Sequence, residues 1–113
     1  MVKSRTHTLN AVFAALSDPT RRTILEGLSE KRRSVTELAD PHEMSLPAIS
    51  KHLRVLQEAG LIVRSKEGRF RHCALNSTPL RDASEWLDQY RRFWESRFDR
   101  LDDFLVNSKK KQP

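Results

Sequence analysis

The sequence has almost none of the features that mark secreted and membrane proteins. Its only cysteine is Cys73, which excludes an intramolecular disulfide framework. No apolar run is long enough for the core of a signal peptide or for a membrane span. We therefore expect a cytoplasmic protein that has no membrane partner.

Hydrophobic residues are also scarce, at 37% of a chain of 113 residues. This length suits a single domain, residues 1–113, but the low apolar fraction leaves little material for a self-sufficient core. We therefore expect a protein partner to complete the fold. No internal repeat or low-complexity linker divides the chain.

Acidic residues are outnumbered, because 21 Lys and Arg face 15 Asp and Glu, giving a net charge of +6 and a pI near 10. Such a balance suits nucleic acid or an anionic membrane surface. Residues 45–72 carry six basic and two acidic side chains, whereas residues 81–106 carry five Arg and seven acidic ones. The middle of the chain is therefore expected to bind the anion, and residues 107–113 form a basic tail.

Helix caps predict three short helices in the first third of the chain. The first covers residues 9–16. Asp18 caps the second and places Pro19 at its first position, where a fixed φ and a missing N–H are harmless. Ser34 and Glu37 have the capping-box spacing of a third helix, residues 34–40, which the following proline, Pro41, should end.

A fourth helix begins after Ser45 and ends at Gly60, which favours the left-handed conformation that stops a helix. At about 100° per residue, its buried stripe is predicted to contain Leu46, Ile49, Leu53 and Leu56. The opposite side carries Pro47, Lys51 and Arg54, with Ser50 at its edge.

The second half predicts a hairpin and a long helix. Residues 61–63 and 70–75 are β-prone and flank a basic turn, so 61–75 indicates a two-stranded hairpin. A final helix is predicted over residues 79–106. The fold class is thus mainly α with a small β-hairpin, in the order α-α-α-α-β-β-α.

Residues 34–59 and the hairpin have the order of a winged helix-turn-helix. A helix fits the major groove of B-DNA, while a basic hairpin, or wing, lies along phosphates or in the adjacent minor groove. The reading helix exposes small, hydroxyl and basic side chains, and its Pro47 and Ala48 are small enough to reach a thymine methyl. The predicted DNA-contacting residues are Ser45, Pro47, Ala48, Ser50, Lys51, His52, Arg54, Lys66, Arg69 and Arg71.

A more ordinary interpretation stands beside this one. Amphipathic helices with Lys and Arg on the wet face are the commonest protein surface, and basic residues of a strand can simply face solvent. A winged helix that binds protein and not DNA is therefore the first alternative.

Three segments together resemble the winged-helix repressors of the ArsR family: LSDPTRRTILEGL (16–28), SVTELAD through SKHLRVLQEAGLI (34–62) and VRSKEGRFRHCAL (63–75). The string S-x-HL-x-x-L-x-x-AGL, from Ser50 to Leu61, is its most specific part. The resemblance implies a homodimer that binds a pseudo-palindromic operator on double-stranded DNA and represses its own and adjacent genes. It also implies that the start of the fourth helix reads bases and that the wing contacts the backbone.

The metal-sensing members of that family differ from this chain. The arsenic and cadmium sensors carry C-V-C-D-L in the third helix, where this chain has Ser34, Val35, Thr36, Glu37 and Leu38. Another class uses Asp and His on the last helix, which here has no histidine. The DPTRR string and a W-L-x-x-Y-x-x-F-W-x-x-R last helix resemble the metal-independent subgroup, often encoded beside a START-like protein. We therefore expect no metal and no cofactor, and the effector is unknown.

His72 and Cys73 leave a second alternative open. Adjacent strand residues point to opposite faces, so the two cannot chelate one ion unless the strand is bent. A metal- or thiol-responsive sensor of the same family that uses Cys73 and histidines in an unfamiliar way is the alternative to a buried strand cysteine. No set of residues suggests a nucleophile, a base and a group that orients the base, so we expect no enzyme activity.

The last helix predicts a dimer. Leu80, Leu87, Trp94 and Leu101 recur every seven residues, and further aromatic residues widen the stripe. One small domain is too small to cover so broad an apolar surface, which favours a second copy as the partner. The alternative is that the last helix packs only on its own domain. A two-fold dimer would place two reading helices about 34 Å apart, one turn of DNA. The predicted interface contains Leu9, Val12, Phe13, Leu87, Tyr90, Trp94, Leu101 and Phe104.

Overall fold

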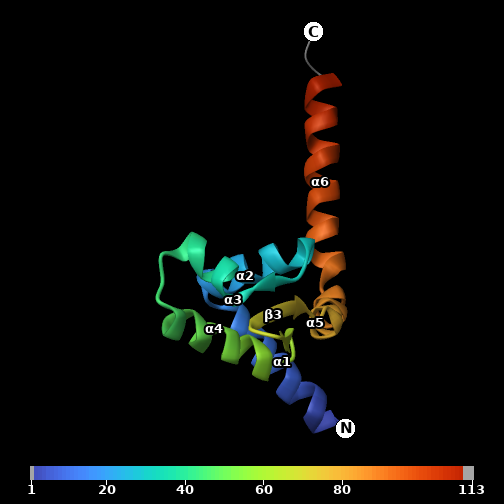
Figure 1. The fold of residues 1–113 in the computed structure, drawn as a ribbon. Helices are drawn as coiled ribbons and strands as arrows, with labels where there is room; N and C mark the ends of the chain where they lie inside the picture. Colours follow the sequence, from blue (N-terminus) through green and yellow to red (C-terminus); the bar gives the residue numbers. More distant parts are fainter. Residues whose placement is uncertain (1, 111–113) are drawn as a thin grey trace. The chain divides into compact units, whose positions relative to one another are not determined.

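The computed structural model describes the backbone of residues 2–110 and the side chains of residues 8–97 and 100–107. It contains two compact units, Met1–Ala83 and Ser84–Pro113. The first unit is a winged helix-turn-helix (Figure 1), mainly helical with a small antiparallel hairpin, as predicted. Its elements are α1 (Val2–Leu16), α2 (Pro19–Glu30), β1 (Arg33–Ser34), α3 (Val35–Ala39), η1 (Asp40–His42), α4 (Leu46–Glu58), β2 (Ile62–Glu67), β3 (Phe70–Leu75) and the start of α5 (Thr78–Asp88).

The helix-turn-helix begins with the predicted capping box. The Ser34 hydroxyl accepts the N–H of Glu37 at 3.2 Å, and the Glu37 carboxylate accepts the N–H of Ser34 at 3.2 Å. Two donors at the start of α3 that have no intrahelical partner are thereby satisfied. The backbone hydrogen bond from Ser34 also lowers the pKa of Glu37 below its usual value.

The other helix signals are confirmed as well. Asp18 accepts the N–H of Arg21 at 3.0 Å and Pro19 opens α2. Ser45 caps α4 by accepting the N–H of Ala48 at 3.3 Å. Gly60 then takes a φ of +76°, the left-handed conformation that few other residues adopt at low cost.

A single core joins the helices of the first unit to the hairpin. α4 contacts α1, α2, α3 and β2, and β3 contacts α2. Burying one large apolar side chain contributes roughly 1.5–3 kcal/mol, so these contacts fix the position of α4. The fully buried side chains include Val12, Ile24, Ile49, Leu53, Leu56, Leu61 and Cys73.

The sheet has one strand more than the sequence predicts. The two-residue strand β1 pairs with β3, Arg33 opposite Cys73 and Ser34 opposite His72, giving the order β1-β3-β2. The hairpin turn contains Gly68 and Arg69, because Glu67 pairs with Phe70. Gly68 has a φ of +59°, as the first position of such a tight turn requires.

Several predicted boundaries are wrong. The first helix starts at Val2 and not at residue 9. The α-helix α3 does end before Pro41, at Ala39, but the chain continues as the 3-10 helix η1, in whose first turn the missing N–H of Pro41 is harmless. The predicted basic tail, 107–113, is helical up to Lys110, and its residues 111–113 lie outside the described part.

The second unit corrects the prediction of one helix over residues 79–106. α5 ends at Asp88 and α6 (Arg91–Lys110) begins after a two-residue turn. Within that turn the Gln89 side chain donates to the carbonyl of Trp86 at 2.9 Å, and the N–H of Tyr90 donates to the carbonyl of Leu87. These bonds satisfy carbonyls at the end of α5 that a continuous helix would have paired.

Two apolar residues lie elsewhere than predicted. Leu46, placed in the buried stripe of the fourth helix, is 52% exposed, because it lines an open hollow beside α3 and the hairpin. Val12, predicted at a dimer interface, is fully buried inside the first unit. Its side chain has no surface left for contact with a second chain.

Candidate nucleic-acid interface

The start of α4 presents the side chains that the sequence assigned to DNA. Pro47, Lys51 and Arg54 are exposed, and Ala48 and Ser50 are half-buried at the edges of the same face. Ser45 is also exposed, at the N-terminus where the first backbone N–H groups of the helix point outward. This end of α4 is therefore open to an anionic partner.

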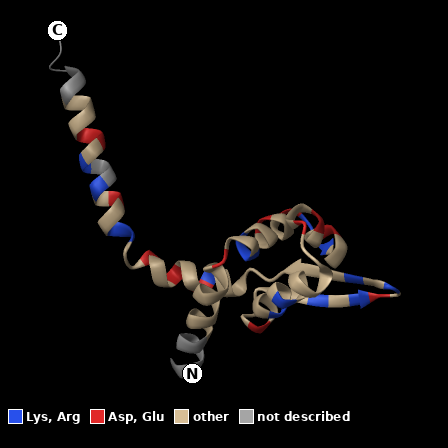
Figure 2. Cartoon of the chain, turned by 90° about the vertical axis from the view of Figure 1, so that its left-hand side faces the viewer, with Lys and Arg blue, Asp and Glu red and all other residues tan. Residues whose placement is uncertain are grey.

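The wing adds a row of positive charge. Lys66 of β2 lies directly opposite Arg71 of β3, and Arg64 is on the same face two residues earlier. Figure 2 shows Lys and Arg on both strands of the hairpin, approaching its tip. Like charges in a direct cross-strand pair destabilise a sheet. An anion bound between them would remove that repulsion.

α4 and the wing share one groove. A hollow of about 440 Å³ lies beside the first turns of α3 and α4 and the hairpin. Arg64, Phe70 and Leu46 line it, although none of the three was predicted to contact DNA. Arg64 could have been predicted from the sequence, because it lies two residues before Lys66 and therefore points to the same face of the strand. The groove is lined by Ser34, Val35, Thr36, Leu46, Ser50, Arg64, Arg69, Phe70 and Arg71.

Glu67, the only acidic side chain of the wing, forms an ion pair with Arg32, which lies outside the wing. Arg32 donates to both carboxylate oxygens of Glu67, at 2.9 and 3.4 Å. The hydrogen bond from Arg32 holds the pKa of Glu67 below its usual value. The negative charge near the hairpin turn is thereby compensated, which keeps the wing surface cationic.

His52 lies mostly covered on α4, against α2. Its Nδ1 is 3.3 Å from Nη1 of Arg21 and 3.8 Å from the carboxylate of Asp18. Arg21 in turn donates to the carbonyls of Ala15 and Ala14, at 2.7 and 3.1 Å, near the end of α1. The ring that we expected on DNA is therefore part of a junction between α1, α2 and α4.

The thiol of the hairpin is buried. Cys73 is fully buried, and burial raises the pKa of its thiol. A protonated thiol is a poor nucleophile and a poor metal ligand. In the described part of the chain, no three His, Cys, Asp or Glu side chains come together in a way that would hold a metal ion.

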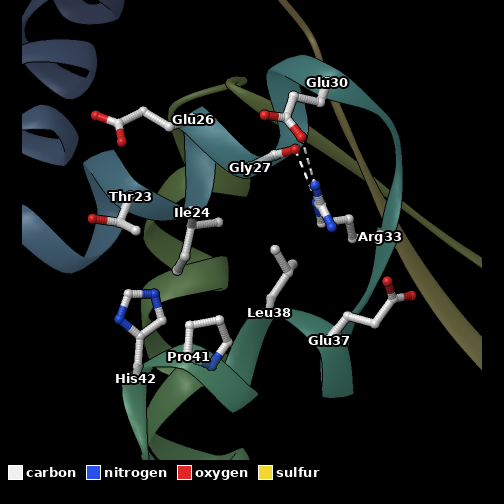
Figure 3. A pocket seen from close by; sticks show the side chains of 10 residues that line it. All are labelled: Thr23, Ile24, Glu26, Gly27, Glu30, Arg33, Glu37, Leu38, Pro41 and His42. Carbon is white, nitrogen blue, oxygen red and sulfur yellow. Dashed lines mark hydrogen bonds and ion pairs between the residues drawn. The ribbon is translucent and has the colours of Figure 1, made fainter.

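A second hollow, of about 310 Å³, lies between α2, α3 and η1 (Figure 3). At its edge, Arg33 donates its Nε–H to the carbonyl of Gly27 at 2.9 Å and pairs with Glu30 at 2.9 Å. Glu37, also in its wall, is already used by the capping box. Arg33 therefore ties β1 to α2 and fixes the point from which α3 starts.

The predicted dimer residues of the second unit are exposed. Leu87, Tyr90, Trp94, Leu101 and Phe104 have between 40% and 67% of their surface accessible. In the first unit, Phe13 of α1 is 38% exposed and Leu9 is half-buried. Apart from Val12, the predicted interface residues thus retain apolar surface.

Comparison with known proteins identifies the chain. A family model described as a helix-turn-helix domain matches residues 16–65. The transcriptional repressor SdpR of Bacillus subtilis is 39% identical over 79 residues, covering 70% of this chain and 88% of SdpR. The crystal structure of the ArsR family transcriptional regulator RHA00566 matches with a TM-score of 0.73 and 42% identity, over 80% of this chain and 94% of that one. The chain belongs to the ArsR family.

A second solved relative agrees with the first. The ArsR-like transcriptional regulator from Rhodococcus sp. RHA1 has a TM-score of 0.67 and 33% identity, over 88% of this chain and 93% of that chain. This ArsR family chain is therefore a DNA-binding transcriptional regulator and not an enzyme. Within its described residues, no helix combines the length and the apolar character needed to cross a membrane.

Proposed function

We propose that this ArsR family regulator is a homodimeric repressor of its own and adjacent genes and that it binds an inverted-repeat operator in the cytoplasm, at the nucleoid. The observation that carries the proposal is the groove shared by α4 and the wing, which Arg64, Arg69 and Arg71 line together with the exposed start of α4. In this arrangement α4 reads base edges in the major groove, and the wing binds phosphates.

The dimer is proposed from the apolar surface that each unit leaves uncovered. The second unit exposes Trp94 and Leu101 on α6, and the first exposes Phe13 on α1. Burying such side chains against a second copy removes apolar area from water. A two-fold dimer places its two α4 helices about one DNA turn apart, which accounts for an inverted repeat.

We assign the regulator to the metal-independent subgroup. Ser34 and Thr36 stand where the arsenic and cadmium sensors have cysteines, and the one cysteine, Cys73, is buried with a raised pKa. Because its DPTRR string and its last helix resemble those of the metal-independent subgroup, we also propose that its gene lies beside a gene for a START-like protein.

Selection from a random-sequence DNA library tests the proposal. The selected duplexes are expected to contain two inverted half-sites with centres one turn apart. On the tightest duplex, Lys51→Ala and Arg54→Ala should each weaken binding by about 1–3 kcal/mol where a base contact is removed. Glu58→Ala, at the exposed far end of α4, is the matched control and should bind as tightly as wild type. Unchanged specific affinity in both α4 variants would remove this helix from the interface.

A further inference from the structure

Leu46 is an apolar side chain exposed on a cationic surface. It is the first residue of α4 and is 52% exposed. A single exposed leucine is ordinary on a protein surface, so its surroundings determine what it means.

Those surroundings are the groove between α4 and the wing. Leu46 lines it together with Ser50, one turn further along α4, and with Phe70 of β3, which is 67% exposed. Arg64 and Arg71 line the same groove. A site that only attracted phosphate would gain nothing from leucine and phenylalanine among its arginines, so the expected ligand has both anionic and apolar groups.

B-DNA offers few apolar groups to such a site. In the major groove every base pair presents hydrogen-bond donors or acceptors, and the C5-methyl of thymine is the one apolar group. A leucine side chain can neither donate nor accept a hydrogen bond. Placed against a cytosine amino group, it would leave that donor without a partner. Against a thymine, it would bury the methyl.

We propose that Leu46 contacts a thymine methyl and thereby selects thymine at one position of each half-site. This inference rests on the proposed function, because it requires the start of α4 to lie in the major groove. It adds a specificity residue to those predicted from the sequence, where Pro47 and Ala48 were the candidates for this contact.

Deoxyuridine tests the contact, because it keeps every hydrogen-bonding group of thymine and lacks only the methyl. Each thymine of the tightest selected duplex is replaced singly, and affinities are measured by fluorescence anisotropy. For wild type, we expect one sensitive thymine position in each half-site. A single replacement there should weaken binding about fourfold, the effect of removing one buried methyl. For Leu46→Ala, the thymine and deoxyuridine duplexes should bind equally at that position.

The controls separate this contact from a general weakening of binding. Leu46 is exposed, so Leu46→Ala should keep the circular dichroism of the wild type. Val63→Ala removes another exposed side chain, 57% accessible, from a strand position that does not line the groove, and should keep the fourfold difference.

Two results would overturn the inference while leaving DNA binding intact. In one, replacing any single thymine with deoxyuridine leaves the affinity of the wild-type protein unchanged. In the other, Leu46→Ala still binds the thymine duplex more tightly than the deoxyuridine duplex, which would show that another residue, such as Pro47, contacts the methyl. Failure to bind any selected duplex would instead overturn the proposed function.

Discussion

The imidazole of His52 lies against Asp18, with its Nδ1 3.8 Å from Oδ2 of the carboxylate. Asp18 caps α2, and His52 belongs to α4, so the contact joins the start of one helix to the middle of the proposed reading helix. Arg21 lies beside both and bonds the last turn of α1. His52 therefore lies at a junction between α1, α2 and α4, and its predicted contact with DNA stays a prediction.

The Asp18 carboxylate should make stability depend on pH. Its pKa lies below the usual 3.8 because it accepts the N–H of Arg21, with a further contribution from the charge of His52. A group whose pKa is lowered by folding stabilises the native state above its unfolded pKa, and this contribution is lost as the pH falls through the lowered value. The difference in unfolding free energy between wild type and Asp18→Asn should therefore be full at neutral pH and shrink below 3.8.

Urea denaturation across that range measures the difference. Asp103→Asn, which removes an exposed carboxylate from α6, is the control and should follow the wild-type profile. A difference between wild type and Asp18→Asn that stayed constant down to the most acidic point would contradict the assignment.

Arg32 should matter for DNA binding although it lies outside the wing. Arg32→Ala releases the Glu67 carboxylate, which then repels phosphate, so affinity for the selected duplex should fall about two- to fivefold. Adding Glu67→Gln should restore part of the affinity. Lys31→Ala removes an equal charge from the same exposed loop without freeing a carboxylate, and it should have the smaller effect. Equal decreases in affinity for Lys31→Ala and Arg32→Ala would show that only net charge counts.

The wing should bind phosphates and not bases. Arg69→Ala and Arg71→Ala should weaken binding to every duplex, selected or random. Each should also flatten the plot of log affinity against log salt by about 0.9 for each phosphate that the variant no longer neutralises. Arg100→Ala, on α6, serves as the comparison of equal charge. Salt slopes identical to wild type for both wing variants would discard the assignment of the wing to the phosphates.

The exposed apolar face of α6 should hold the dimer together. Leu101→Glu places a charge where a buried leucine is proposed to contribute roughly 1.5–3 kcal/mol, so sedimentation should shift towards single chains. Asn107→Glu introduces the same charge six residues later, on a different face of this helix, and should leave the dimer intact. A monomeric wild type at micromolar concentration would contradict the dimer itself.

Local signals in the sequence predicted the helix-turn-helix well. Ser34 with Glu37, Ser45 and Gly60 act through hydrogen bonds and backbone angles within a few residues, so their effects can be read without the fold. The strand β1 could not be predicted in this way, because its two residues become a strand only by pairing with β3, about forty residues away.

The misplaced residues depended on tertiary neighbours. Periodicity gives the direction of a side chain on a helix but not what covers it, which is why Leu46 was assigned to the core and Val12 to an interface. The break after Asp88 has neither proline nor glycine to mark it, and it is closed by the side chain of Gln89. The heptad pattern of the apolar residues continued through the break and concealed it.

Competition between duplexes measures whether this protein reads DNA sequence as a dimer. A labelled selected duplex is titrated with this protein near physiological salt, in the presence of increasing amounts of an unlabelled random duplex of equal length. A sequence-reading dimer should prefer the selected duplex by about 10³-fold or more and bind it as two chains per duplex. Equal affinity for the two duplexes, or no binding to either at low salt, would contradict a dimer that reads DNA sequence.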